Sequence, residues 1–150
     1  LTPRRNVFFC RAGHPLLAKD SLSTNDLFGY PLATPLIAPG IRKVLANLSG
    51  RIDFAPAIEI EQFAALASIV LQSDAIGLGA EDAFVTAFAS GELNVLHWRN
   101  LPHNLDSLNN RCGVISRAGV RLSPAAKALI ETLQAVESQA DWPAQTSRSH

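Results

Sequence analysis

The stretch "CRAGHPLLAKDSLSTNDLFGYPL", residues 10–32, contains the end of one predicted strand, a short predicted helix and the start of a second strand. The β-branched and aromatic residues at 6–11 favour a strand, which the Gly and Pro that follow bring to an end. Ser23 is a residue type that caps helix N-termini, and Gly29 stands at the expected helix stop. Residues 30–34 predict the next strand, so sheet and helix alternate from the start of the chain.

The same alternation continues towards the C-terminus. Apolar runs predict further strands at residues 57–60, 75–79, 93–98 and 112–117. Helical spacing predicts helices at residues 41–49, 62–72 and 80–91, and a last helix from Ser123-Pro124 with the apolar stripe Leu129, Ile130, Leu133 and Val136. Strands that alternate with short helices favour an α/β fold with mostly parallel pairing. The aperiodic tail, residues 139–150, is predicted to be mobile.

The composition argues against a chain that binds nucleic acid by itself. Thirteen basic residues balance thirteen acidic ones, whereas binding through phosphate contacts calls for a basic surplus. No apolar run has the length of a membrane span and no secretion signal is visible, which predicts a cytoplasmic location without a membrane partner. The two cysteines are far apart in the sequence and do not suggest a disulfide framework.

The stretch at 10–32 resembles the middle of the effector-binding domain of LysR-type transcriptional regulators. There a strand ends in Arg-x-Gly-His-Pro-Leu, and a Ser-x-x-Asp-Leu helix and a "yPl" strand follow. Further similar segments come in the family's order: "FAALASIVLQSDAIGLGAEDAF" (63–84), "GELNVLHW" (91–98) and "GVISRAGVRLSPAAKALIETLQ" (113–134). The similarity covers roughly residues 6–137. The sequence departs from the family at Ser73-Asp74-Ala75, where Gly-x-Gly is usual, and at Ala80, where Pro is common.

This resemblance implies a periplasmic-binding-protein-like (type II) fold with two lobes, one complete and the other partial. It divides the chain into a first-lobe strand and outward hinge (1–18), a complete effector-binding second lobe (19–97), a return hinge strand with the C-terminal helix of the first lobe (98–138), and the tail (139–150). The sequence Arg-Ala-Gly ends two of the predicted strands, at residues 11–13 and 117–119. By the resemblance, these two strands would be the crossings between the lobes. The implied hinge residues are Cys10, Arg11, Ser116 and Arg117. The family's N-terminal winged helix-turn-helix and the first strands of the first lobe are expected outside this chain.

The candidate effector site lies where predicted strands end and helices begin. Free N–H groups at a helix N-terminus favour a carboxylate or another small anion. Two segments fit this description, and the resemblance agrees with the first of them. They contribute Thr34, Ala38, Pro39, Gly40 and Ile41 from "TPLIAPGIRK", and Glu61 and Gln62 before the next helix. Ordinary helix entry is the alternative for Pro39 and Gly40, and a solvated first turn is the alternative for Gln62.

The sequence contains no pattern that indicates catalysis, a metal or another cofactor. His14 lies in a turn and is better interpreted as a structural residue, and no Gly-x-Ser-x-Gly elbow or complete phosphate loop occurs. We therefore predict the ligand-sensing domain of a bacterial LysR-type regulator, not an enzyme. Its partners would be a small effector, other copies of the chain in a dimer or tetramer, and DNA only through the absent domain. Helix 62–72 would contribute to the dimer contact or simply to the core. The alternative is a periplasmic-type solute-binding protein, and an enzyme of the same architecture is a distant third.

Overall fold

The computed structural model describes residues 3–97, 108–109 and 112–139. The chain forms two compact units, Arg5–Asn110 and a smaller one made of Leu1–Arg4 with Arg111–His150. The larger unit contains all five strands of the sheet, and the smaller unit contains the last helix. Residues 6–18, which the resemblance places in the first lobe and outward hinge, fall within the larger unit. The assignment of residues to lobes stays a prediction.

The larger unit is built on a five-stranded sheet in the order β3-β2-β4-β1-β5. The strands are β1 (Asn6–Arg11), β2 (Leu32–Thr34), β3 (Ile58–Glu59), β4 (Ile76–Ala80) and β5 (Leu93–Val95). β2 is parallel to β3 and to β4, whereas β1 is antiparallel to both β4 and β5. The expectation of mostly parallel pairing is therefore wrong for half of the pairs. A regular alternation of strands and helices does not fix the direction of a strand such as β1, which is inserted between two strands that come later in the chain.

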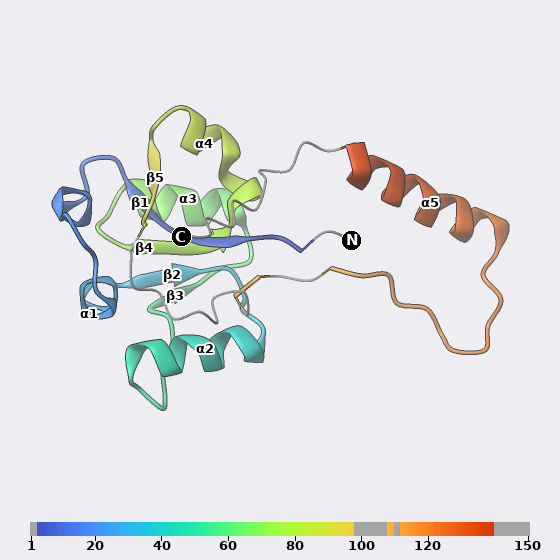
Figure 1. Ribbon diagram of the computed structural model, residues 1–150, viewed down its shortest axis with the longest axis horizontal. Helices are drawn as coiled ribbons and strands as arrows, with labels where there is room; N and C mark the ends of the chain where they lie inside the picture. The colour runs from blue at the N-terminus through green and yellow to red at the C-terminus, as the bar shows by residue number, and fades with distance from the viewer. Residues whose placement is uncertain (1–2, 98–107, 110–111, 140–150) are drawn as a thin grey trace, which may run out of the picture. The chain divides into compact units, whose positions relative to one another are not determined.

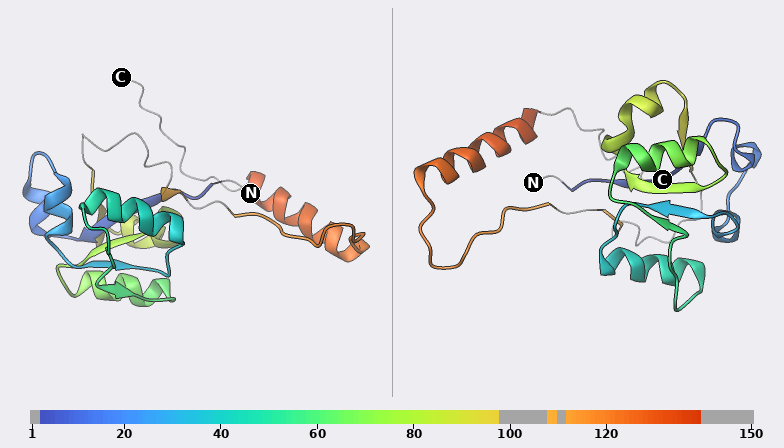
Figure 2. Two further views of the ribbon diagram at one scale, coloured as in Figure 1. Left: turned by 90° about the horizontal axis from the view of Figure 1, so that it is seen from below. Right: turned by 180° about the vertical axis from the view of Figure 1, so that it is seen from behind.

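Two longer helices cover opposite faces of this sheet. They are α2 (Pro39–Ser49) and α3 (Phe63–Leu71), which Figures 1 and 2 show on either side of the strands. The shorter elements are η1 (Pro15–Ala18), α1 (Thr24–Phe28), η2 (Glu81–Phe84) and α4 (Val85–Ala89). The helix predicted at 80–91 is thus divided into a 3-10 turn and one short α-helix. Ser23 caps α1 as predicted, and its hydroxyl accepts a hydrogen bond from the Asp26 N–H.

The alternation of side chains along β1 produces two cores. Phe8 and Cys10 pack on the α2 side, whereas Val7 and Phe9 pack on the α3 side. Phe9 lies opposite Gly77 of β4, and a Cβ atom at Gly77 would lie only 2.3 Å from the Phe9 ring. The glycines of "AIGLG" therefore leave room for aromatic rings and do not form a phosphate loop.

The smaller unit contains α5 (Pro124–Gln139), which begins after Ser123 as predicted. The predicted apolar stripe is present, but Leu129, Leu133 and Val136 remain 61%, 43% and 61% exposed. The strand predicted at 112–117 is wrong, because these residues form no strand in the described part of the chain. A strand requires a neighbour that pairs with its N–H and C=O groups, and the described part of this unit offers none. None of the described helices is long and apolar enough to cross a membrane.

Candidate functional site

The carboxyl ends of β2 and β3 meet at one edge of the sheet. The two strands are parallel, with Thr34 opposite Glu59, and the Ile60 N–H donates a hydrogen bond of 3.0 Å to the Thr34 carbonyl. The residues that follow each strand therefore leave the sheet side by side. The structure thus places Thr34 and the Glu61-Gln62 pair, which the sequence proposed from separate segments, at one edge.

Two helix N-termini without side-chain caps approach this edge from opposite faces. α2 begins after Ala38, whose side chain cannot accept a hydrogen bond, and Pro39 occupies the first turn. α3 begins after Gln62, whose side chain makes no capping bond either. Neither first turn contains an acidic residue. The N–H groups of Gly40 and Ile41 precede the first intrahelical donor of α2, and the helix dipole adds a partial positive charge there.

Thr34 supplies a buried polar group on the α2 side of the edge. Its side chain is fully buried, and within the described residues its Oγ1 has no hydrogen-bond partner. Leu32, two residues earlier, packs with Ile41 and Leu45 of α2. Because alternate strand residues share a face, the Thr34 hydroxyl points towards the same side. A buried hydroxyl without a partner costs roughly 1–3 kcal/mol, so a group that bonds it would recover free energy.

The charges near this edge are partly neutralised. Arg42 in the second turn of α2 forms an ion pair with Glu59 at 2.7 Å. Glu61 and Gln62 are exposed, and the described residues offer no hydrogen-bond partner to the Gln62 amide. Gln62 is therefore free to orient a ligand, whereas the Glu61 carboxylate would oppose a close anion. The part of Glu61 and Gln62 in binding stays a prediction.

Two of the predicted hinge residues, Cys10 and Arg11, belong to the larger unit, and the other two, Ser116 and Arg117, belong to the smaller one. Cys10 is fully buried on β1, opposite Asn94 of β5, and this burial raises the pKa of its thiol to about 11. Arg11 ends β1 and donates two hydrogen bonds to Asp74 Oδ1, at 3.1 Å from Nε and 2.7 Å from a terminal nitrogen. Ser116 and Arg117 are exposed and outside any helix or strand. Their role as a hinge stays a prediction.

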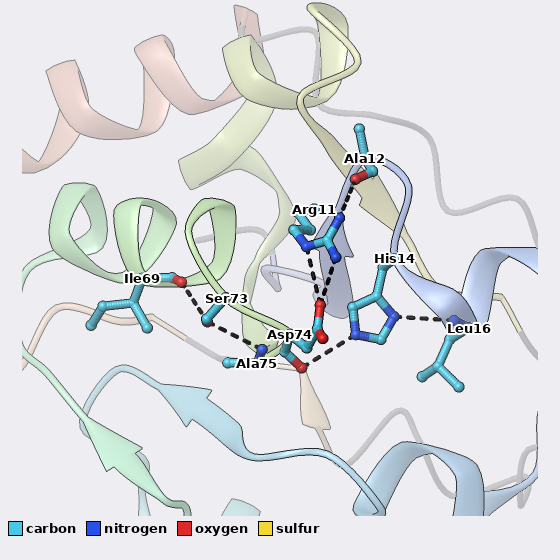
Figure 3. Close-up of polar contacts among 8 residues, drawn as sticks. All are labelled: Arg11, Ala12, His14, Leu16, Ile69, Ser73, Asp74 and Ala75. Atoms are coloured by element: carbon cyan, nitrogen blue, oxygen red, sulfur yellow. Dashed lines mark hydrogen bonds and ion pairs between the residues drawn. The ribbon is translucent and has the colours of Figure 1, made fainter.

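Figure 3 shows that Asp74 joins the end of β1 to the turn before β4. The buried His14 ring accepts the Leu16 N–H at Nδ1 (3.1 Å) and lies 3.2 Å from the Asp74 carbonyl through Nε2. Since Nδ1 accepts, a neutral His14 carries its proton on Nε2 and donates it to that carbonyl. This arrangement supports the structural interpretation of His14. The sequence singled out Asp74 only as a departure from Gly-x-Gly, and nothing in it indicated the bond to Arg11.

Across residues 3–97, 108–109 and 112–139, no group of three or more His, Cys, Asp or Glu side chains is arranged to hold a metal ion.

Comparison with known proteins identifies the family. The family model described as "LysR substrate binding domain" matches residues 1–138. The "SDS degradation transcriptional activation protein" of Pseudomonas sp. (strain ATCC 19151) is 36% identical over 136 residues, which make up 86% of this chain and 42% of that protein. The chain therefore spans less than half the length of this relative.

Two solved structures share the fold at 22% identity. The effector-binding domain of QuiR in complex with shikimate has a TM-score of 0.64, over 93% of this chain and 64% of that one. The Synechocystis PCC6803 CcmR regulatory domain in complex with 2-PG has a TM-score of 0.66, over 95% and 68%. These matches confirm the type II periplasmic-binding-protein-like α/β fold. The family model and the curated relative favour a regulator over a solute-binding protein. The chain belongs to the LysR substrate-binding domain family.

Proposed function

We propose that this chain senses a small anionic effector and that effector binding controls DNA binding by a winged helix-turn-helix elsewhere in the full-length regulator. The observation that carries the proposal is the buried, unpartnered Thr34 hydroxyl on the α2 side of the sheet, beside an uncapped helix N-terminus. The hydroxyl can bond a ligand oxygen while the first-turn N–H groups of α2 bind its negative charge. The arrangement supports binding rather than catalysis.

The names of related proteins suggest which anions to test first. The titles of two structural neighbours name shikimate and 2-PG as their ligands, and the curated relative is named for the degradation of SDS. Shikimate is a carboxylate and SDS is an alkyl sulfate, so both present an anionic group to a protein. A panel of small carboxylates and short-chain alkyl sulfates covers both chemistries.

We further propose that the regulator acts in the cytoplasm as a homo-oligomer. α3 is a candidate for the contact because Phe63, at its first turn, is 44% exposed. The same helix also buries Leu66 and Val70 completely in the core. Its Ala- and Leu-rich sequence is therefore explained in part by core packing. The molar mass of the full-length protein from light scattering, with and without Phe63→Glu, tests whether this helix end takes part.

Thr34→Val is the sharpest test of the effector site because it removes the hydroxyl and nearly preserves the side-chain volume. Without ligand, we expect the variant to be as stable as the wild type or more stable, since an unpaired buried hydroxyl is lost. Affinity for the anion that binds the full-length regulator should fall by roughly tenfold, which corresponds to about 1.4 kcal/mol. Calorimetric titration with thermal unfolding measures both quantities.

Unchanged affinity in Thr34→Val would place the effector elsewhere and contradict the proposal. The variant to compare with Thr34→Val is Gln62→Ala, which removes the candidate ligand-binding side chain at the start of α3. If Gln62 orients the ligand, its affinity loss should appear without any gain in the stability of the free protein.

A further inference from the structure

We propose that an open groove along the outer side of α2 is a second ligand site, which takes an amphipathic anion such as a medium-chain carboxylate. The groove has a volume of about 900 Å³ and lies between α2 and the loop 50–54 that follows it. This volume is within the range of small-molecule sites. Thr34 does not line the groove, so the inference holds whether or not an effector binds at the sheet edge.

The two walls of the groove follow from the local sequence. Lys43, Asn47 and Gly50 lie three or four residues apart, which places them along one side of α2, and all three line the groove. α2 ends at Ser49, and Gly50 caps it in the left-handed conformation (φ 67°) and donates its N–H to the carbonyls of Ala46 and Asn47. This turn starts the 50–54 loop, which forms the second wall.

The groove has an apolar floor joined to the protein core. Phe54 lines it, is only 8% exposed, and packs edge-on against Phe28 with ring centroids 5.2 Å apart. Phe54 belongs to the core cluster that also contains Leu45 of α2. Ile52, in the same loop, is 96% exposed. A hydrocarbon chain in the groove would contact Phe54 and cover Ile52, which the described part of the protein leaves open to water.

The charge of the groove favours an anion. Lys43 and Arg51 line it, and their charged groups have no ion-pair or hydrogen-bond partner within the described residues. The third cation, Arg42, is paired with Glu59. Asp53 is the acidic side chain among the lining residues and opposes anion binding. An apolar floor with two unpaired cations matches a molecule that has a hydrocarbon body and a negatively charged head.

Titration of the full-length regulator with decanoate, below its micelle concentration, tests this site. We expect saturable binding that weakens roughly three- to tenfold in the double variant Lys43→Gln/Arg51→Gln, since each exposed charge contributes modestly. Asp53→Asn should tighten binding because it removes the opposing charge. Ile52→Ser should weaken decanoate more than hexanoate, because the longer chain has more hydrocarbon surface to bury against Ile52.

Two controls separate this site from the effector site and from non-specific adsorption. Thr34→Val should leave decanoate binding unchanged, and decanol, which has no charge, should bind more weakly than decanoate. The inference is overturned if decanoate does not saturate, or if decanol binds equally well. It is also overturned if Thr34→Val, and not the double charge variant, weakens binding, because decanoate would then occupy the sheet edge.

Discussion

The two compact units of this chain bury their apolar residues to very different extents. The larger unit, Arg5–Asn110, contains every buried hydrophobic residue of the described chain, on both faces of a five-stranded sheet. In the smaller unit, α5 has an apolar stripe at helical spacing but no buried residue. Periodicity thus predicts which side of a helix is apolar, and only the presence of a neighbouring element decides whether that side is covered.

The largest expected difference in stability is between alanine substitutions of two helical leucines, one in each unit. Leu66 of α3 is fully buried, whereas Leu129 of α5 is 61% exposed. We expect Leu66→Ala to lower the free energy of unfolding by about 2–5 kcal/mol, through lost burial and a cavity. Leu129→Ala in this 150-residue chain should cost less than about 1 kcal/mol, as surface substitutions do. Denaturant unfolding of both variants measures the difference.

The same pair of variants in the full-length regulator sharpens the comparison. We expect residues that precede this chain in the longer protein to complete the first lobe and cover the α5 stripe. Leu129→Ala should then cost nearly as much as Leu66→Ala. If Leu129→Ala stays neutral in the full-length protein, α5 does not pack against a first lobe.

Glycine substitutions test how closely the larger unit is packed. A Cβ at Gly77 would lie 2.3 Å from the Phe9 ring, whereas a Cβ at Gly40 in the first turn of α2 would meet no atom within 4 Å. We expect Gly77→Ala to lower stability by about 1–3 kcal/mol, because the ring must shift in a filled core. Gly40→Ala should be neutral or slightly stabilising, since alanine favours a helix. Similar thermal midpoints for the two variants would show that the Phe9 side of the core is loosely packed.

Sequence patterns were most informative where the structure depends on local chemistry. The Ser23 cap, the start of α5 and the strand that ends at Thr34 all follow from residue types and short-range spacing. α2 begins at Pro39, two residues before the predicted helix 41–49. The antiparallel direction of β1 depends on which strands it joins, and the missing strand at 112–117 depends on a neighbour that is not in the described unit. Neither is encoded within the segment itself.

The candidate site was predictable to a similar extent. The sequence placed Thr34 at a strand end next to a helix start, which the structure bears out. It did not indicate that the Thr34 hydroxyl is buried without a partner, because burial and hydrogen bonding depend on the helix and strand packed around it. For the same reason, the Arg11–Asp74 ion pair, whose partners are far apart in the sequence, was not foreseen.

The smallest expected effect on stability comes from the N-terminal caps of two helices, α1 in the larger unit and α5 in the smaller one. In α1, the Asp26 carboxylate accepts hydrogen bonds from the Ser23 N–H (2.9 Å) and hydroxyl (2.6 Å) and pairs with Lys19. The hydrogen bonds from Lys19 and Ser23 hold the pKa of Asp26 well below its usual value of 3.8. The cap of α5 is Ser123, whose hydroxyl accepts the Ala126 N–H. Ala126 stands where α1 has Asp26, so no carboxylate takes part in the α5 cap.

Acid should therefore weaken the α1 cap and spare the α5 cap. A carboxyl whose pKa is lower in the folded protein than in the unfolded chain stabilises the fold above the unfolded value, and this contribution disappears as the pH falls through the folded value. We expect the stability difference between the wild type and Asp26→Asn to shrink as the pH falls from 5 towards 2, whereas Ser123→Ala should cost the same throughout. Amide hydrogen exchange in the first turns of α1 and α5 reports each helix separately. A difference for Asp26→Asn that does not change with pH would mean that the negative charge of the Asp26 carboxylate does not contribute to the α1 cap.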